Sequence, residues 1–142
     1  MPLDGSQRAE LILPHVDALA KCFKSQVILL NVIEPVHVLS SSAPVDWVET
    51  AVEAEEVENA EIYLHRIETR FQEQGIQVES FVMDGSPVKE IIKLATEEDV
   101  DLIAIASHGY TGLARVFYGS VAVGLVHHTD RPLLIIRAND LT

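Results

Sequence analysis

The chain has 142 residues, a formal net charge of −12, 48 % hydrophobic residues and a mean hydropathy of +0.20. This apolar content is enough for the core of one folded domain, and it excludes an intrinsically disordered chain. The negative charge disfavours DNA, RNA and anionic lipid as partners, and the longest apolar runs are too short to span a bilayer. We therefore expect a single domain over residues 1–142 that binds neither nucleic acid nor membrane.

The cysteine content and the first residues indicate a cellular compartment. Cys22 is the only cysteine, so no intrachain disulfide can form. The N-terminal residues show no basic region followed by an apolar stretch, which is the pattern of a secretory signal. Both observations favour a cytoplasmic protein.

Strand and helix patterns alternate from the start of the chain. Residues 1–3 have the composition of the end of a strand. Apolar residues at steps of three and four then predict a helix that Ser6 caps and Phe23 ends, bent at Pro14. A continuous apolar run predicts a second strand over residues 27–32. The following stretch, rich in serine and proline, predicts an exposed loop over residues 34–46.

The same alternation continues to the end of the chain. An acidic helix is predicted over residues 47–74, ended by Gly75, and a third strand over residues 76–83. Pro87 occupies the first position of a third helix. The remaining predicted elements are a strand at residues 102–106, a helix at 120–128 and a strand at 133–136.

Five short apolar strands separated by helices predict an α/β fold: a three-layer sandwich with a five-stranded parallel sheet and helices on both faces. Right-handed crossovers favour the strand order 3-2-1-4-5, a flavodoxin-like topology. That order reverses between the first and fourth strands, and ligands bind such sheets at the carboxyl ends of the strands there. The loops at this point are residues 4–6 and 107–119.

The second of these loops has the layout of an anion site. Its ends are Ala106-Ser107-His108-Gly109 and, after nine further residues, Gly119-Ser120 at the start of the last helix. Small residues let a phosphate approach the backbone, and the first turn of a helix offers unpaired N–H groups. Arg115 adds a guanidinium that suits phosphate oxygens. An ordinary turn with a serine N-cap and a solvated arginine explains the segment equally well on its own.

With these patterns the chain resembles the universal stress protein family over nearly its whole length. The family's Pro-x-Asp-Gly-Ser appears as Pro2-Leu3-Asp4-Gly5-Ser6. Its Gly-x-x-Gly, nine residues, Gly-Ser or Gly-Thr appears in residues 106–120, with Ala106 in place of the first glycine. Its late Pro-x-x-x-x-(Arg/Lys) runs from Pro132 to Arg137.

The resemblance implies an adenine nucleotide as ligand, ATP foremost, with Mg²⁺ as a candidate ion held through the phosphates. In members that bind ATP, the residue matching Asp4 lies by the adenine and ribose, and the residue matching Val32 presents backbone groups to adenine. Glycine and serine of the long motif hold the ribose and phosphates. The predicted nucleotide-binding residues are Pro2, Asp4, Val32, Ala106, His108, Gly109, Arg115, Gly119, Ser120 and Val121. For His108, a hydrogen bond that orders the loop is the alternative to a phosphate contact.

Two departures from the family pattern bear on this expectation. Alanine disfavours a positive φ, so Ala106 costs roughly 1 kcal/mol if glycine's conformation is required there. Only Met1 precedes Pro2, where family members have several strand residues. Either the central strand is short or the natural start lies upstream, and in both cases a less stable fold is expected for this chain.

The sequence favours a stress-response regulatory protein over an enzyme. We find no nucleophile–base pair and no Gly-x-x-x-x-Gly-Lys-(Ser/Thr) phosphate loop, so at most slow ATP hydrolysis is expected. One alternative is a nucleotide-independent homodimeric stress or scaffold protein, and a second is a metal-dependent nucleotide hydrolase. A homodimer through the apolar last strand, residues 133–136, is predicted because this strand lies at a sheet edge.

Overall fold

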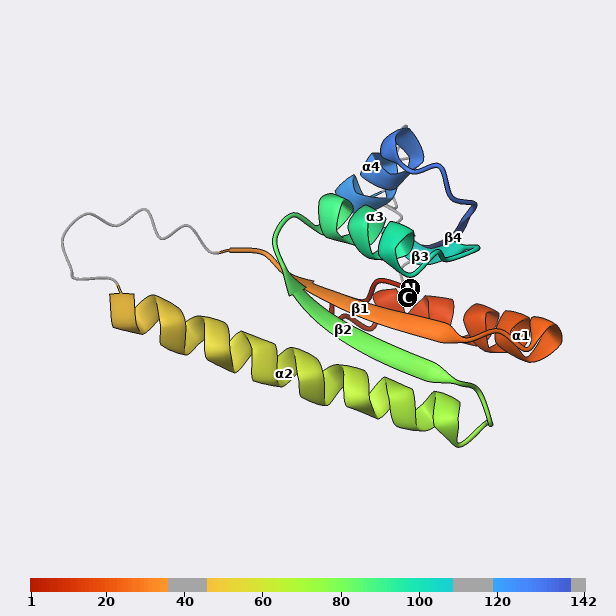
Figure 1. The fold of residues 1–142 in the computed structure, drawn as a ribbon, viewed down its shortest axis with the longest axis horizontal. Helices are drawn as coiled ribbons and strands as arrows, with labels where there is room; N and C mark the ends of the chain where they lie inside the picture. The colour runs from red at the N-terminus through yellow and green to blue at the C-terminus, as the bar shows by residue number, and fades with distance from the viewer. Residues whose placement is uncertain (36–45, 109–118, 139–142) are drawn as a thin grey trace.

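The computed structural model describes residues 1–35, 46–108 and 119–138, with the side chains of α2 described from residue 54 onward. Strands and helices alternate along these residues, as the sequence predicts (Figure 1). The elements are the 3-10 helix η1 (Ala9–Ile12), α1 (Leu13–Phe23), β1 (Val27–Ile33), α2 (Asp46–Gln72), β2 (Val78–Asp84), α3 (Pro87–Glu97), β3 (Ile103–His108), α4 (Ser120–His128) and β4 (Leu133–Ala138).

The strands form two parallel pairs. β1 pairs with β2 from Val27 opposite Val78, and β3 pairs with β4 from Ile103 opposite Leu133. Both pairings and their parallel direction confirm the prediction. Within the described residues these pairs are two separate two-stranded sheets, so the single five-stranded sheet is not observed.

The separation of the two sheets has its physical reason in residues 1–3. Leu30 N donates to Met1 O at 3.1 Å, and Leu3 N donates to Leu30 O at 2.8 Å. These bonds make one isolated bridge, between Pro2 and Leu30, rather than a ladder. Residues 1–3 therefore lie beside β1, and among the described residues no backbone bridge links them to β3.

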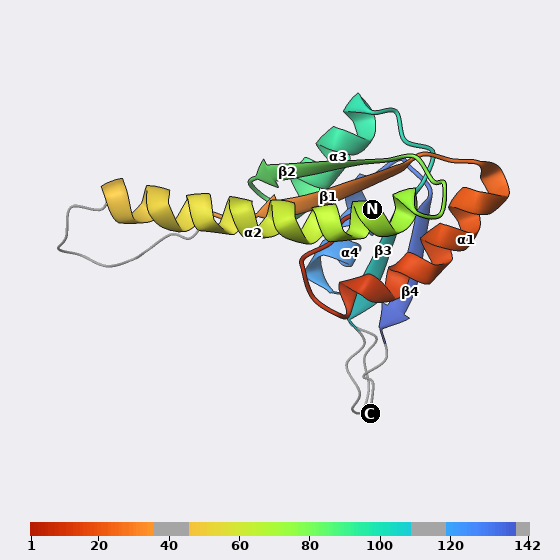
Figure 2. The same cartoon turned by 90° about the horizontal axis from the view of Figure 1, so that it is seen from below.

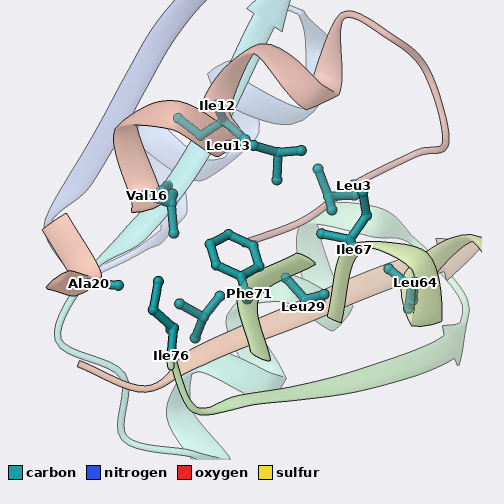
Figure 3. Packing of buried hydrophobic residues seen from close by; sticks show 12 residues of the cluster. Leu3, Ile12, Leu13, Val16, Ala20, Leu29, Leu64, Ile67, Phe71 and Ile76 are labelled. Atoms are coloured by element: carbon teal, nitrogen blue, oxygen red, sulfur yellow. The ribbon is translucent and has the colours of Figure 1, made fainter. Parts of the chain in front are cut away.

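Helices cover both faces of the strands, which confirms the predicted layers. Figure 1 shows α2 on one side of β1 and β2, with α3 and α4 on the other. Helix α1 packs on the α2 side, because its Leu13 and Val16 share a buried cluster with Phe71 of α2. Successive strand residues alternate between the two sides, since Leu29 packs toward α2 and Leu30 toward α3. We call the two buried groups the α2-side cluster, shown in Figure 3, and the α3-side cluster. The α2-side cluster comprises Leu3, Ile12, Leu13, Val16, Ala20, Val27, Leu29, Leu64, Ile67, Phe71, Ile76 and Ala104. The α3-side cluster comprises Leu30, Ile91, Leu94, Ala95, Ile103, Ile105 and Leu125.

The predicted helix boundaries hold with one correction. Gly75, with φ +74°, follows the end of α2, and Pro87 occupies the first turn of α3. Pro14 also lies in a first turn, that of α1, because the chain enters this helix through η1. The prediction that Pro14 bends the middle of one continuous helix is therefore wrong. A proline in the first turn removes no helical hydrogen bond, since that N–H has no partner within the helix.

The long helix α2 is amphipathic over the part whose side chains are described. Its buried stripe is Ala60, Leu64, Ile67 and Phe71, and Phe71 is only 1 % exposed. Glutamates such as Glu58 and Glu61 lie on the exposed face. Within the described ranges, no helix combines the length and the apolar character that crossing a membrane requires.

Candidate functional site

A cavity of about 200 Å³ opens where the carboxyl ends of β1 and β3 meet residues 2–4 and the start of α4. We call it the carboxyl-end cleft. This is the place at which the predicted sheet order locates a ligand. Seven of the predicted site residues line it: Pro2, Asp4, Val32, Ala106, Gly119, Ser120 and Val121.

The other three predicted site residues are not placed in the cleft. His108 is the last residue of β3, and its side chain is not among those described. Gly109 and Arg115 lie outside the described residues. Their contacts with a ligand stay predictions.

Asp4 is held at the cleft by a tight turn. Gly5 has φ +83°, and Ser6 N donates to Asp4 Oδ1 at 2.9 Å. Ser6 Oγ in turn accepts a hydrogen bond from Ala9 N at 3.1 Å, at the start of η1. The carboxylate of this exposed residue is thus fixed on the local backbone, in the geometry of an Asx turn.

Asn31 fixes the same segment from the inside. Its side chain is buried, and Nδ2 donates to Leu3 O at 2.8 Å. This polar residue, which interrupts the apolar run of β1, therefore holds residues 2–4 against the strand. The hydrogen bond also satisfies its amide, which lowers the cost of burying it.

Val32 presents main-chain groups to the cleft. In a parallel ladder the backbone groups of alternate residues point to opposite edges of a strand. Val27 and Ile33 bond to the β2 side, whereas Leu30 bonds to residues 1–3. By this alternation the N–H and C=O of Val32 point away from β2, toward the cleft that Val32 lines. An adjacent donor and acceptor on one strand edge suit the edge of a planar heterocycle.

The N-terminus of α4 supplies the anion-binding side. Gly119 is the N-cap residue, and no side chain caps the helix by a hydrogen bond among the described residues. The first helical bond runs from Val123 N to Gly119 O at 3.0 Å. The N–H groups of Ser120, Val121 and Ala122 precede this bond and line the cleft. They carry the positive end of the helix dipole.

Ala106 does not require the conformation of glycine. It lies within β3, opposite Ile136, and the described non-glycine residues with positive φ are Lys24 and Asp99. The cost expected from placing alanine at this motif position therefore does not arise. Alanine adopts extended backbone as readily as other L-residues.

Sequence reasoning missed part of the lining, namely Leu3, Ala9, Leu30, Glu34, Pro87, Ile91, Ile105, Ser107 and Ala122. Pro87 and Ile91 follow the carboxyl end of β2, so the sheet topology could have identified them. Glu34 directly follows β1 and adds a second carboxylate to that of Asp4. The described lining includes no lysine or arginine, and the described groups that suit an anion are the N–H groups at the start of α4.

Comparison with known proteins agrees with this layout. The model of the universal stress protein family matches residues 1–137. The chain belongs to this family. A universal stress protein of Methanocaldococcus jannaschii, MJ0577, is 29 % identical over 96 % of this chain and 91 % of its own length. One of Synechocystis is 30 % identical over 95 % of this chain and 94 % of its own length.

Solved structures of universal stress proteins share the fold. The structure of MJ0577 superposes with a TM-score of 0.80 at 31 % identity, covering 98 % of this chain and 94 % of that one. A universal stress protein solved in complex with cAMP has a TM-score of 0.68 at 18 % identity and covers 98 % of this chain and 94 % of its own. That of Archaeoglobus fulgidus in complex with dAMP also has a TM-score of 0.68, at 19 % identity, with 95 % and 93 % covered.

Proposed function

We propose that this universal stress protein binds an adenine nucleotide, with ATP as the favoured ligand, in the carboxyl-end cleft. It then acts as a cytoplasmic regulatory protein of the stress response, with slow or no hydrolysis. The observation that carries the proposal is the convergence of seven predicted residues on one cleft beside the N-terminus of α4. Two relatives of the same fold, solved with cAMP and with dAMP, support an adenine nucleotide.

We infer a place for each part of the nucleotide from the chemistry of the lining. Phosphate oxygens accept hydrogen bonds from the N–H groups of Ser120 and Val121, where the helix dipole favours negative charge. The adenine edge faces the main chain of Val32. The Asp4 carboxylate accepts from ribose hydroxyls, since an ionised carboxylate is an acceptor only. Mg²⁺ bound through the phosphates offsets the two acidic side chains of the cleft.

We also propose that residues 1–3 occupy the central position of the sheet, between β1 and β3. Leu3 bonds to Leu30 of β1, and it lines the same cleft as Ile105 of β3. The resulting order is β2, β1, residues 1–3, β3, β4, which is the order 3-2-1-4-5 expected from the sequence.

The direct test is to denature freshly purified protein and identify the released ligand by mass spectrometry. The ligand-free protein is then titrated with ATP and Mg²⁺ in a calorimeter. A stoichiometric adenine nucleotide, or saturable binding of ATP, is the expected result. A protein that is purified empty and does not bind added ATP contradicts the proposal.

Asp4 offers a test within the cleft. Asp4→Asn keeps the side-chain oxygen that accepts from Ser6 N, so the turn persists while the charge is lost. We expect the affinity for ATP to fall about tenfold, or roughly 1.4 kcal/mol, because a hydrogen bond to a charged acceptor is replaced by a neutral one. Asp101→Asn, an exposed aspartate just before β3, is the matched control and should leave the affinity unchanged. If both variants bind ATP with equal affinity, Asp4 does not contribute to nucleotide binding.

A nucleotide-independent homodimeric scaffold is the second candidate function. The observation that favours it is β4, whose residues Leu133, Leu134, Ile135 and Ile136 are only half-buried. Among the described elements β4 pairs with β3 alone, so its other edge is open. A second copy would cover this apolar edge.

A further inference from the structure

The outer edge of β2 borders a groove that the nucleotide cleft does not include. One depression of about 520 Å³ lies against this strand and the neighbouring face of α2. A second of about 500 Å³ lies at the turn from α2 into β2, and Gln26, before β1, also lines it. Figures 1 and 2 both show α2 running alongside β2. We call it the β2–α2 groove. From α2 it is lined by Glu61, Ile62, His65, Glu68 and Gln72, and from β2 by Val78, Glu79, Ser80 and Val82.

The main chain of β2 has hydrogen-bonding groups directed into this groove. Val27 N donates to Gln77 O at 2.8 Å, and Gly85 N donates to Ile33 O at 2.9 Å. The odd-numbered residues of this segment therefore use their backbone groups on β1, and the even-numbered ones point to the outer edge. Ser80 and Val82 are even-numbered and line the groove. Over the described ranges β2 pairs with β1 alone, so these edge positions are open to another strand.

The groove carries three acidic side chains and one exposed apolar side chain on α2, that of Ile62. Glu61, Glu68 and Glu79 are its charged residues, and the described lining contains no lysine or arginine. Ile62 is 63 % exposed, so it offers an accessible apolar contact in the groove. His65 lies beside Glu68, with 3.4 Å between Nδ1 and Oε2.

We propose that the β2–α2 groove binds an extended basic segment of a partner protein as an added β-strand. Main-chain bonds to Ser80 and Val82 give the segment its register, as in other cases of strand addition. Alternate side chains of an added strand lie on the α2 side, where Val78 and Val82 also pack. A lysine or arginine there meets Glu61 or Glu68, and an apolar residue meets Ile62.

The negative charge of the groove favours a basic segment over a second copy of the chain. A second copy that paired at this edge would bring the carboxylates of its own groove against Glu61, Glu68 and Glu79. A basic segment instead finds complementary charge and is steered toward the groove. The proposal does not depend on the carboxyl-end cleft, so the two can fail separately.

The test uses a capped hexapeptide, acetyl-Lys-Val-Lys-Val-Lys-Val-amide, titrated into the ¹⁵N-labelled protein. We expect saturable shifts of the amide resonances of Ser80 and Val82, and slower hydrogen exchange at both. The matched peptide acetyl-Glu-Val-Glu-Val-Glu-Val-amide should give no shifts at the same concentration. Equal binding of both peptides, shifts that map to β4 instead, or no saturable shift would each overturn the proposal.

Two pairs of variants separate strand addition from simple charge attraction. Ser80→Pro removes the N–H that points to the outer edge, and it leaves every N–H that bonds to β1 in place. Edge strands tolerate proline at such positions. Ser80→Pro should weaken binding of the basic peptide at least tenfold, whereas Ser80→Ala should stay within twofold. The double change Glu61→Gln and Glu68→Gln should weaken binding of the basic peptide about tenfold. The matched control, Glu97→Gln with Glu98→Gln near the end of α3, should leave binding unchanged.

A second measurement keeps the test decisive if Ser80→Pro does not fold, as judged by circular dichroism. The basic peptide and a sibling with N-methylated amides along both edges are titrated into the unchanged protein. Strand addition requires peptide N–H groups that reach β2, so only the unmethylated peptide should bind saturably. Equal binding of the two peptides would rule out strand addition.

Discussion

Ala106 stands where the family's long motif has its first glycine, and it lies in extended backbone within β3. Its side chain packs against the α2-side cluster. Replacing Ala106 with glycine adds backbone freedom that the extended strand does not need, and it removes a partly buried methyl group. We therefore expect Ala106→Gly to leave ATP affinity within twofold and to destabilise the fold by about 0.5–1 kcal/mol. Calorimetric titration and urea unfolding measure the two effects, and a tenfold gain in affinity would contradict the structural reading.

Tyr63 is the described side chain whose titration the fold changes most clearly. Burial raises the pKa of its phenol above the ordinary value of about 10, and the carboxylates of Glu10 and Asp4 raise it further. The nearby guanidinium of Arg66, 5.4 Å from the centre of the ring, acts in the opposite direction. The folded protein thus holds this proton more tightly than the unfolded chain does.

The sign of the pH effect follows from this difference. Above about pH 10 the unfolded chain loses the Tyr63 proton while the folded protein keeps it, so the free energy of unfolding falls as pH rises. Below pH 10 the contribution is constant. In urea unfolding, we expect the free energy of unfolding of the protein to fall relative to that of Tyr63→Phe between pH 9 and 11. The lysines and the other tyrosines are common to both proteins and cancel. A difference that does not change over this range would contradict the raised pKa.

Helices α3 and α4 approach one another closely at Gly124. A Cβ atom on this residue would lie 2.5 Å from Cγ2 of Val88, closer than real contacts allow. Valine is stiff at χ1, so the methyl group cannot swing aside easily. The absence of a side chain at Gly124 therefore sets where α4 packs, and with it the position of Ser120 in the cleft.

Gly124→Ala tests this packing against helix propensity. In an open helix the change stabilises by about 1 kcal/mol, whereas here overpacking should reverse the sign and destabilise by about 1–3 kcal/mol. In a Val88→Ala background the same change should become neutral or stabilising. Urea unfolding of the four proteins gives the coupling directly. If Gly124→Ala stabilises the unmodified protein, the contact does not constrain α4.

The elements predicted most accurately were those with local signals. The start of α3 follows from Ser86-Pro87, that of α4 from Gly119-Ser120, and the end of α2 from Gly75. The entry to the first helix was predicted wrongly. A pattern of apolar residues at steps of three and four does not separate η1 from α1, because both helices place such residues on one face.

Much of the cleft was predictable because its residues stand at strand ends. Asp4, Val32 and Ala106 follow from topology together with the family motif. Glu34 and Ile91 were missed, since an acidic residue in a loop and an apolar residue on a helix look like ordinary surface and core. The separation of the sheets was also missed. It depends on how many backbone bonds residues 1–3 make, and no sequence pattern reports that number.

At the scale of the whole molecule, β4 presents another open strand edge, since among the described elements it pairs with β3 alone. Ile103 N donates to Pro132 O at 2.9 Å, so even-numbered residues of this segment bond to β3 and odd-numbered ones point outward. Ile135 is odd-numbered and half-buried, in the middle of the apolar run. A dimer formed by strand pairing at this edge would use its N–H.

We expect light scattering at micromolar concentration to give twice the chain mass of 15.7 kDa. Ile135→Pro should give a monomer, because it removes an outward N–H without touching the β3 ladder. Ile135→Ala is the matched control, since it shortens the side chain by a similar amount and keeps the N–H, and it should remain a dimer. If both variants are monomers, apolar contact rather than strand pairing holds the dimer. A monomeric mass for the unmodified protein would refute dimerisation, and with it the scaffold function that depends on a second copy.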